Sequence, residues 1–205
     1  MAFKLIVSLF RALGRPDEDA CEYLEFAALA TVGDVMPLTG ENRIIVREGL
    51  IQLNNTENAG LRALIQVNGL EGKEINSYHI GFVIGPCINA SGRLDTAKKA
   101  LDLLLCENPA EATELAEELL YLNNERKELT LAGYEEAVYL IENSGLKRDK
   151  VLVVYLPKIH ESIAGIIAGR IRERYYRPVF VLTDGERDVK GSGRSIEGYS
   201  MFEEM

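Results

Sequence analysis

Apolar residues recur at helical spacing through most of the chain and form short continuous runs only in its last third. The segment MAFKLIVSLFRALG predicts an amphipathic helix that packs on a neighbour and ends at Gly14, because its charged residues share one face. Residues 20–30 predict a second, buried helix, and residues 57–70 predict a short one. Residues 41–55, ENRIIVREGLIQLNN, predict a short strand followed by a helical turn.

The second half of the chain predicts a long helical region followed by a small α/β unit. Helical periodicity runs through residues 96–143 and is interrupted by a turn at Pro109. Apolar runs at 151–156 and 178–184 predict strands on either side of a helix over 162–175. If these strands are parallel, the crossover is right-handed. A third strand is expected to run into the glycine cluster that follows.

The composition is that of a folded globular protein, with 47% hydrophobic and 27% charged residues among 205. No apolar run approaches the roughly 20 residues that span a bilayer, which excludes an integral membrane protein. The apolar start lacks the small-residue cleavage site of a signal peptide. Three cysteines without CxxC spacing indicate neither a disulfide framework nor a thiolate zinc site, so we expect a cytoplasmic protein.

The formal net charge of -9 is unevenly distributed. Acidic residues dominate 96–146, whereas 147–205 carry a small basic excess. A negative total argues against indiscriminate coating of DNA, because non-specific affinity comes from phosphate neutralisation by Lys and Arg. A local basic groove remains compatible with this charge.

The string KGSGRS, residues 190–195, is the strongest local chemical signal. Gly191 and Gly193 permit the positive φ angles of an anion-binding nest, and the neighbouring hydroxyls and cations suit a phosphate. The alternative is a glycine-rich hairpin turn with incidental charges. The candidate phosphate-binding residues here are Ser192, Gly193, Arg194 and Ser195.

NASGR, residues 89–93, offers a similar combination ahead of a long helix. Asn89 and Arg93 could grip a phosphate or a strand backbone, and the alternative is a helix start with a surface arginine. His160 lies between a predicted strand and a helix, where α/β proteins place ligands, although capping of that helix would explain it equally. His79 lies on an apolar, strand-like stretch and is expected to be structural.

Asp34 is the one candidate metal ligand. It lies in an apolar loop bounded by glycine and proline, where an unpaired buried carboxylate is costly and a metal ion would justify it. A loop hydrogen bond is the alternative. One carboxylate cannot hold a catalytic metal pair, and the sequence contains no HExxH, DxD or DHH string that would supply further ligands.

Four ordered blocks together resemble one family. LATVGDVMPLTGENR, IGPCINASGRLDTA, HESIAGIIAGRI and KGSGRSIEG resemble the RecJ family of single-stranded-DNA-specific exonucleases, within the DHH phosphoesterase superfamily. The resemblance implies an enzyme that uses two Mn²⁺ or Mg²⁺ ions to remove nucleotides from the 5′ end of single-stranded DNA in repair and recombination.

The resemblance also implies the domain organisation of an α/β protein. Residues 1–50 would be the C-terminal part of a DHH catalytic domain, residues 51–145 a linking segment with a long helix, and residues 146–205 a DHHA1 domain with a mixed sheet. The DHH strings are absent and a helix is just beginning at the last residues, so we expect a truncated, internal fragment.

The same resemblance assigns roles to the candidate residues. Asp34 matches the last metal-binding aspartate of the catalytic site, and Asn89 and Arg93 match a motif placed near the DNA strand. Arg194 and Ser195 match the strand-binding signature of DHHA1. Many relatives have arginine where Cys87 stands, and the oligonucleotide-binding domain that usually follows is absent, so DNA affinity is in doubt more than chemistry.

Two alternatives stay open. One is a DHH-DHHA1 phosphodiesterase for cyclic dinucleotides or short oligonucleotides, and the other is a non-catalytic replication scaffold. For the isolated chain we expect no catalysis and possible binding of single-stranded DNA. We also expect a non-native dimer or a rearrangement of residues 1–60, driven by unpaired sheet edges and exposed apolar faces.

Overall fold

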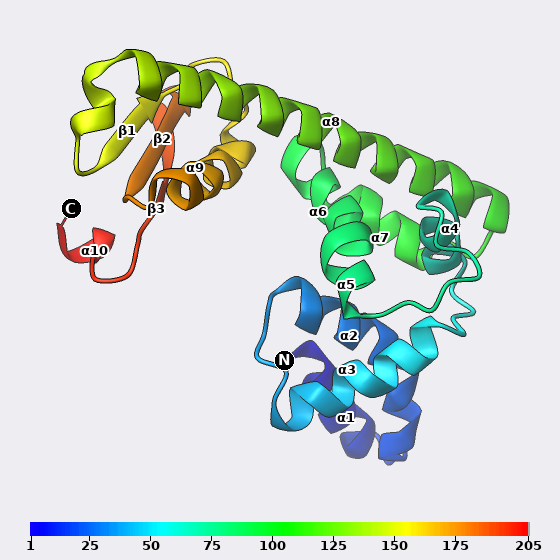
Figure 1. Cartoon of the computed structure of the whole chain (residues 1–205). Helices are drawn as coiled ribbons and strands as arrows, with labels where there is room; N and C mark the ends of the chain where they lie inside the picture. Colours follow the sequence, from blue (N-terminus) through cyan, green and yellow to red (C-terminus); the bar gives the residue numbers. More distant parts are fainter. Residues whose placement is uncertain (205) are drawn as a thin grey trace. The chain divides into compact units, whose positions relative to one another are not determined.

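The computed structural model describes residues 1–204 and divides into two compact units, Met1–Asn123 and the part that begins at Asn124. In the described residues the first unit is entirely helical, and the second contains a three-stranded mixed sheet (Figure 1). One long helix, α8, carries residues of both units. The predicted α/β class, the long helix and the small mixed sheet are confirmed.

The first unit is built from short helices before α8. They are α1 (Ala2–Ala12), a 3₁₀ helix (Asp17–Tyr23), α2 (Leu24–Gly33), α3 (Gly40–Leu53), α4 (Ala59–Val67), α5 (Ser77–His79), a π-helical turn (Ile80–Ile84), α6 (Gly85–Leu94) and α7 (Lys98–Leu105). Its core gathers the aliphatic side chains of α3, α4, the π turn, α7 and α8, including Leu53, Leu61, Leu64, Ile80, Ile84, Leu103 and Leu119.

Helix α1 is amphipathic and ends at Gly14, as the sequence predicts. Gly14 has a φ of 69°, and the Arg15 N–H donates to the Phe10 carbonyl at 2.8 Å, which is the six-to-one bond of a Schellman motif. Phe10 is buried, whereas Leu5 and Leu9 are 70% and 51% exposed. The apolar face of α1 is therefore only partly covered by the described residues.

Residues 41–55 form no strand, so that part of the prediction is wrong, although the predicted helical turn is present. Residues 41–53 lie in α3, whose buried residues Val46, Gly49 and Leu53 follow helical spacing. A Cβ at Gly49 would lie 2.3 Å from the Leu24 carbonyl oxygen, so glycine allows α3 to pack directly on the backbone of α2. The β-branched residues favoured a strand locally, but close packing between the helices decides the conformation.

The stretch around His79 is also helical rather than strand-like. Asn76 caps α5 by accepting hydrogen bonds from the backbone N–H groups of Tyr78 and His79, and His79 Nδ1 accepts from the Asn76 N–H at 3.2 Å. His79 thus has a structural role, as expected. From α5 the chain continues through the π turn into α6 without a break.

Helix α8 spans Pro109–Asn143 and confirms the predicted break before it. Proline suits the first helical position because it has no N–H to leave unsatisfied, and the Asn108 side chain accepts from the Ala110 N–H at 3.0 Å. At 35 residues the helix is roughly 50 Å long. Ala116 and Leu119 lie in the first core, whereas Ala137 and Ile141 lie in the second.

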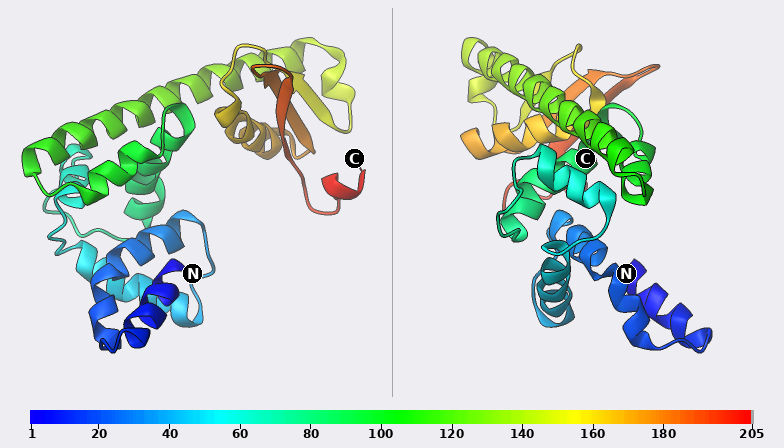
Figure 2. Two further views of the ribbon diagram at one scale, coloured as in Figure 1. Left: turned by 180° about the vertical axis from the view of Figure 1, so that it is seen from behind. Right: turned by 90° about the vertical axis from the view of Figure 1, so that its right-hand side faces the viewer.

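The second unit places a helix on one face of its sheet. Strands β1 (Leu152–Tyr155) and β2 (Val179–Asp184) are parallel, and β3 (Val189–Arg194) pairs antiparallel with β2. Helix α9 (Glu161–Tyr175) connects β1 to β2 and packs on β2 and β3 (Figures 1 and 2). A short 3₁₀ helix (Gly145–Arg148) precedes β1, and α10 (Met201–Glu204) follows β3. Inward-facing valines and isoleucines, among them Val154, Ile163, Ile167, Val179 and Val181, form the core.

The structure bears on two expectations, self-association through sheet edges and the absence of a membrane-spanning helix. Residues 1–60 contain no strand, so the unpaired sheet edges that motivated a non-native dimer do not exist there, and self-association itself stays a prediction. Among the described residues, the helices are either too short or too polar to cross a bilayer.

Glu25 of α2 makes the stability of the first unit dependent on pH. Its side chain is buried, and among the described residues Oε2 has no hydrogen-bond partner. Burial raises the pKa of this carboxyl, opposed by a hydrogen bond from Thr56. The folded state therefore favours the protonated acid. The contribution of Glu25 to the free energy of unfolding is largest below the pKa that this carboxyl has in the unfolded chain. It is lost as the pH rises through the pKa of the folded state.

We predict that Glu25→Gln, which cannot ionise, raises the melting temperature relative to wild type more at about pH 8 than at about pH 4. Calorimetric melting curves at both pH values test this. Glu18→Gln, the same change at an exposed position of this unit, should show no such difference. Equal shifts for Glu25→Gln at both pH values would contradict the assignment.

Candidate functional site

Asp34 follows the last residue of α2 in a strained helix terminus. The Met36 N–H donates to the Thr31 carbonyl at 3.1 Å and the Val35 N–H to Val32 at 3.0 Å, so the end is a Schellman motif. The left-handed position that normally holds glycine is occupied by Val35, with a φ of 53°. For a β-branched residue this costs about 1–2 kcal/mol, and such strain is concentrated at functional sites.

Asp34 and Asn89 line the same pocket, although α2 and α6 are far apart in the sequence. The pocket has a volume of about 300 Å³, and its remaining walls are the backbone of Gly33 and Gly85 and apolar side chains such as Phe26 and Leu104. A carboxylate and an amide are thus the two polar side chains of an otherwise apolar pocket. Two residues that the sequence singled out separately are brought together here.

The described residues do not complete a metal site. No group of three or more His, Cys, Asp or Glu side chains within residues 1–204 is placed to hold a metal ion. A two-metal centre needs several such ligands. Asp34 could therefore contribute one ligand to a metal held mainly by other residues.

The NASGR string lies in the second half of α6 rather than at the start of a helix, so that expectation is wrong. Asn89 is exposed and Arg93 is half-buried in the last turn. Cys87, in the same helix, is fully buried and faces the core: its thiol lies 3.6 Å from Asn68 Oδ1, and Asn123 Nδ2 donates to its sulfur at 3.4 Å. The side of α6 that carries Asn89 therefore does not include Cys87.

The glycine motif forms no anion nest, which corrects another expectation. Gly191 and Gly193 lie within β3 and neither has a positive φ. Both leave room for neighbouring side chains: a Cβ at Gly191 would lie 2.5 Å from a Leu182 methyl of β2, and one at Gly193 would lie 2.8 Å from the Met201 sulfur and 3.0 Å from the Phe180 ring. The string is a strand, neither a nest nor a hairpin turn.

The alternation of β3 places its polar side chains on the other face, against α9. Lys190 pairs with Glu161 at 2.5 Å, and this carboxylate raises the Lys190 pKa. Arg194 donates from Nη1 to Ser192 Oγ at 3.1 Å. A Cβ at Gly165 would lie 2.7 Å from Arg194 Nη2, so this glycine leaves room for the guanidinium beside the helix.

Lys190, Ser192 and Arg194 therefore form one row, which we call the β3 row. Its two cations and one hydroxyl are the groups that recognise phosphate oxygens. Ser195 follows the row but donates its hydroxyl to the Tyr199 carbonyl, inside the loop. In this structure Ser195 thus shapes the turn after β3.

His160 caps α9, the alternative that the sequence left open. Its Nδ1 accepts from the Ser162 N–H at 3.3 Å and lies 2.7 Å from the Ser162 hydroxyl. The side chain is exposed at the helix N-terminus, where an anion is favoured. Its contact with phosphate stays a prediction.

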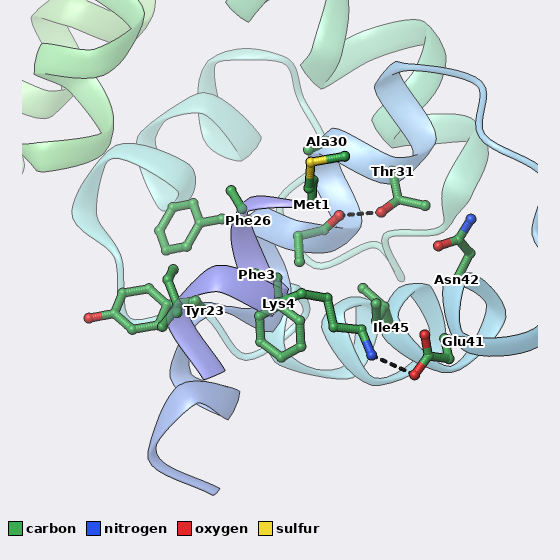
Figure 3. A pocket seen from close by; sticks show the side chains of 13 residues that line it. Met1, Phe3, Lys4, Tyr23, Phe26, Ala30, Thr31, Glu41, Asn42 and Ile45 are labelled. Atoms are coloured by element: carbon green, nitrogen blue, oxygen red, sulfur yellow. Dashed lines mark hydrogen bonds and ion pairs between the residues drawn. The ribbon is translucent and has the colours of Figure 1, made fainter. Parts of the chain in front are cut away.

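A further pocket of about 390 Å³ lies beside α1 and contains none of the predicted site residues (Figure 3). Its walls include Phe3, Tyr23 and Phe26, and the Lys4 ammonium pairs with Glu41 at 2.5 Å (Figure 3). The two charged side chains of its lining, Lys4 and Glu41, thus pair with each other.

Comparison with known proteins relates the whole chain to one kind of nuclease. The sequence is 39% identical over 207 residues to the "Single-stranded-DNA-specific exonuclease RecJ" of Bacillus subtilis, covering 100% of this chain and 25% of that protein. This chain is homologous to a segment of RecJ. No protein-family model matches it.

Solved structures support the same relation. A crystal structure of RecJ in complex with Mg²⁺ from Thermus thermophilus has a TM-score of 0.87 and 38% identity, covering 98% of this chain and 31% of that one. A crystal structure of exonuclease RecJ bound to manganese has a TM-score of 0.83 and 39% identity, covering 98% and 49%. The chain spans between 25% and 38% of the length of the curated RecJ-type relatives it matches.

Two features of the sites were not foreseen from the sequence. The strain at Val35 has no signal in the sequence, because valine does not indicate a left-handed backbone conformation. Gly165, by contrast, has one: a glycine inside a predicted helix is unfavourable unless something approaches its backbone closely. The roles assigned to Asp34, Asn89, Arg93, His160 and the β3 row remain predictions.

We predict that Gly165→Ala displaces Arg194 without unfolding the unit, because the atoms nearest the added methyl would be the flexible end of Arg194 and the Ser192 hydroxyl rather than backbone. The Nε–H resonance of Arg194 in ¹H–¹⁵N NMR spectra should move. Gly169→Ala is the matched control on the same helix, since nothing lies within 4 Å of its added methyl. The control should leave the Arg194 signal in place and gain about 0.5–1 kcal/mol of helix stability. An unmoved signal in Gly165→Ala would contradict the packing.

Proposed function

We propose that this chain is part of a RecJ-type, single-stranded-DNA-specific exonuclease that hydrolyses phosphodiester bonds from the 5′ end in DNA repair and recombination. The observation that carries the proposal is the shared pocket of Asp34 and Asn89, which joins two motifs of the RecJ resemblance at one place. Homology along the whole chain, to proteins named for this activity, supports it. We place the protein in the cytoplasm.

Asp34 would supply one oxygen ligand to a two-metal centre, and the RecJ structures with Mg²⁺ and with manganese support these cofactors. Bound metal ions would activate water and neutralise the charge that develops on the scissile phosphate. In this proposal Asp34 holds its carboxylate at a fixed position, because the Schellman motif with its strained Val35 fixes the end of α2.

The β3 row would hold the DNA backbone in the second unit. Arg194 can bind phosphate oxygens through two parallel N–H groups, and the Ser192 hydroxyl can donate a further hydrogen bond. Lys190 is engaged by Glu161, so a phosphate there would compete with a carboxylate. Asn89, Arg93, His160 and Ser195 complete the proposed substrate contacts.

Binding of a single strand tests the proposal. We predict salt-sensitive binding of a labelled 5′-phosphorylated single strand, measured by fluorescence anisotropy, with weaker binding of its 5′-hydroxyl and duplex forms. Arg194→Ala should weaken binding about tenfold, the worth of one charge-assisted phosphate contact.

Arg187→Ala is the control, since it removes a similar exposed charge outside the β3 row. Equal losses for the two variants would show a general electrostatic effect and no specific site. A preference for cyclic dinucleotides over long strands would favour the small-substrate phosphodiesterase instead.

Catalysis by the chain alone is not expected. Residues 1–204 contain no group of three metal-binding side chains, so a catalytic metal pair has too few ligands. We predict no release of nucleotides from a 5′-labelled single strand with Mn²⁺, at protein concentrations that saturate binding. Turnover above the metal-only blank, lost in Asp34→Ala, would contradict this.

A further inference from the structure

We infer that Tyr78 and Phe82 form a stacking step for the nucleobases of a single strand, a contact that deepens the proposed function and rests on it. Both rings are largely exposed, at 62% and 69%. Their centroids are 4.9 Å apart with 28° between the ring planes, an offset stack. Single exposed aromatic side chains are common on folded proteins, whereas a contiguous exposed apolar patch marks an interaction site.

The helical stretch from α5 through α6 separates the two rings from the core. Ile80, Ile84 and Cys87 are fully buried on one side. Tyr78, Phe82 and Asn89 are exposed on the other, with Arg93 half-buried one turn beyond Asn89. Tyr78 and Phe82 stack on each other, and Asn89 and Arg93 are one turn apart in α6. None of the four lies on the buried side of this stretch.

This order matches the chemistry of a nucleic-acid strand. Arg93 and Asn89 carry groups that complement phosphate and sugar oxygens, and the two rings one or two turns away offer π faces to bases. A peptide or a second copy of the chain would not require a stacked aromatic pair in line with a cation.

The loop after Asp34 extends the apolar surface beside the rings. Val35, Met36 and Leu38 line a pocket of about 480 Å³ together with Tyr78 and Phe82. Val35 is 87% exposed, so its strained conformation does not bury it in the core. The strain turns an apolar side chain outward beside the rings and immediately after Asp34, at the edge of the proposed site.

The test compares two fluorescent strands of equal length, oligothymidylate and its abasic counterpart, which have the same phosphates. In wild type we expect oligothymidylate to bind at least about tenfold more tightly in anisotropy titrations, because stacking on aromatic rings contributes about 1–3 kcal/mol per base. The double variant Tyr78→Leu with Phe82→Leu keeps apolar bulk and removes both rings. It should lose this preference and bind the abasic strand as wild type does.

Arg194→Ala is the contrasting variant, since it should lower the affinity for oligothymidylate and for the abasic strand by the same factor. If wild type binds both strands with equal affinity, or the double leucine variant retains the preference, the stacking step is overturned while the proposed DNA binding stands. If wild type binds neither strand, the proposed function fails and the stacking step fails with it.

Circular dichroism melts establish that the double leucine variant is folded. Sedimentation velocity tests whether the two rings form a self-association surface instead: a dimer in wild type that is lost in the variant would overturn the inference.

Discussion

The contact between the backbones of α2 and α3 fixes the geometry of the first unit. With no side chain at Gly49, α3 packs against the Leu24 carbonyl, and α2 is held along its length. A helix held in this way ends at a defined point in space. Asp34 stands at that point, so the position of a candidate metal ligand depends on a glycine in the neighbouring helix.

Close approach at glycine recurs at the other sites. Gly60 lets α4 approach the Leu103 carbonyl of α7, where a Cβ would lie only 2.1 Å away, and Gly165 makes room for Arg194 beside α9. At Gly60 any side chain would overlap the Leu103 backbone, whereas at Gly165 a methyl would overlap the Arg194 and Ser192 side chains. Glycine thus allows close backbone packing in the first unit and leaves space for polar side chains in the second.

Sequence patterns predicted the elements with strong periodicity and failed where tertiary contacts decide. The end of α1 at Gly14, the break before Pro109 and the strands of the second unit followed from local signals that the fold retains. The strand predicted within residues 41–55 is absent: β-branched side chains favour a strand locally, but Gly49 permits a packed helix. The predicted nest at β3 failed for a related reason: its glycines leave room for the side chains of Leu182, Phe180 and Met201, and neither has a positive φ. That Asp34 and Asn89 share a pocket could not be read from either motif alone.

The position of β3 in the sheet has a consequence for solubility. In the described part of the chain β3 has a neighbour on one side only, and its glycines leave much of the backbone uncovered. Such an edge invites another strand to pair with it, the first step of aggregation. Lys190 and Arg194 on this edge oppose pairing, because another strand would bring its like charges close or desolvate these ones. The cations proposed to hold DNA would then also keep the unoccupied protein in solution.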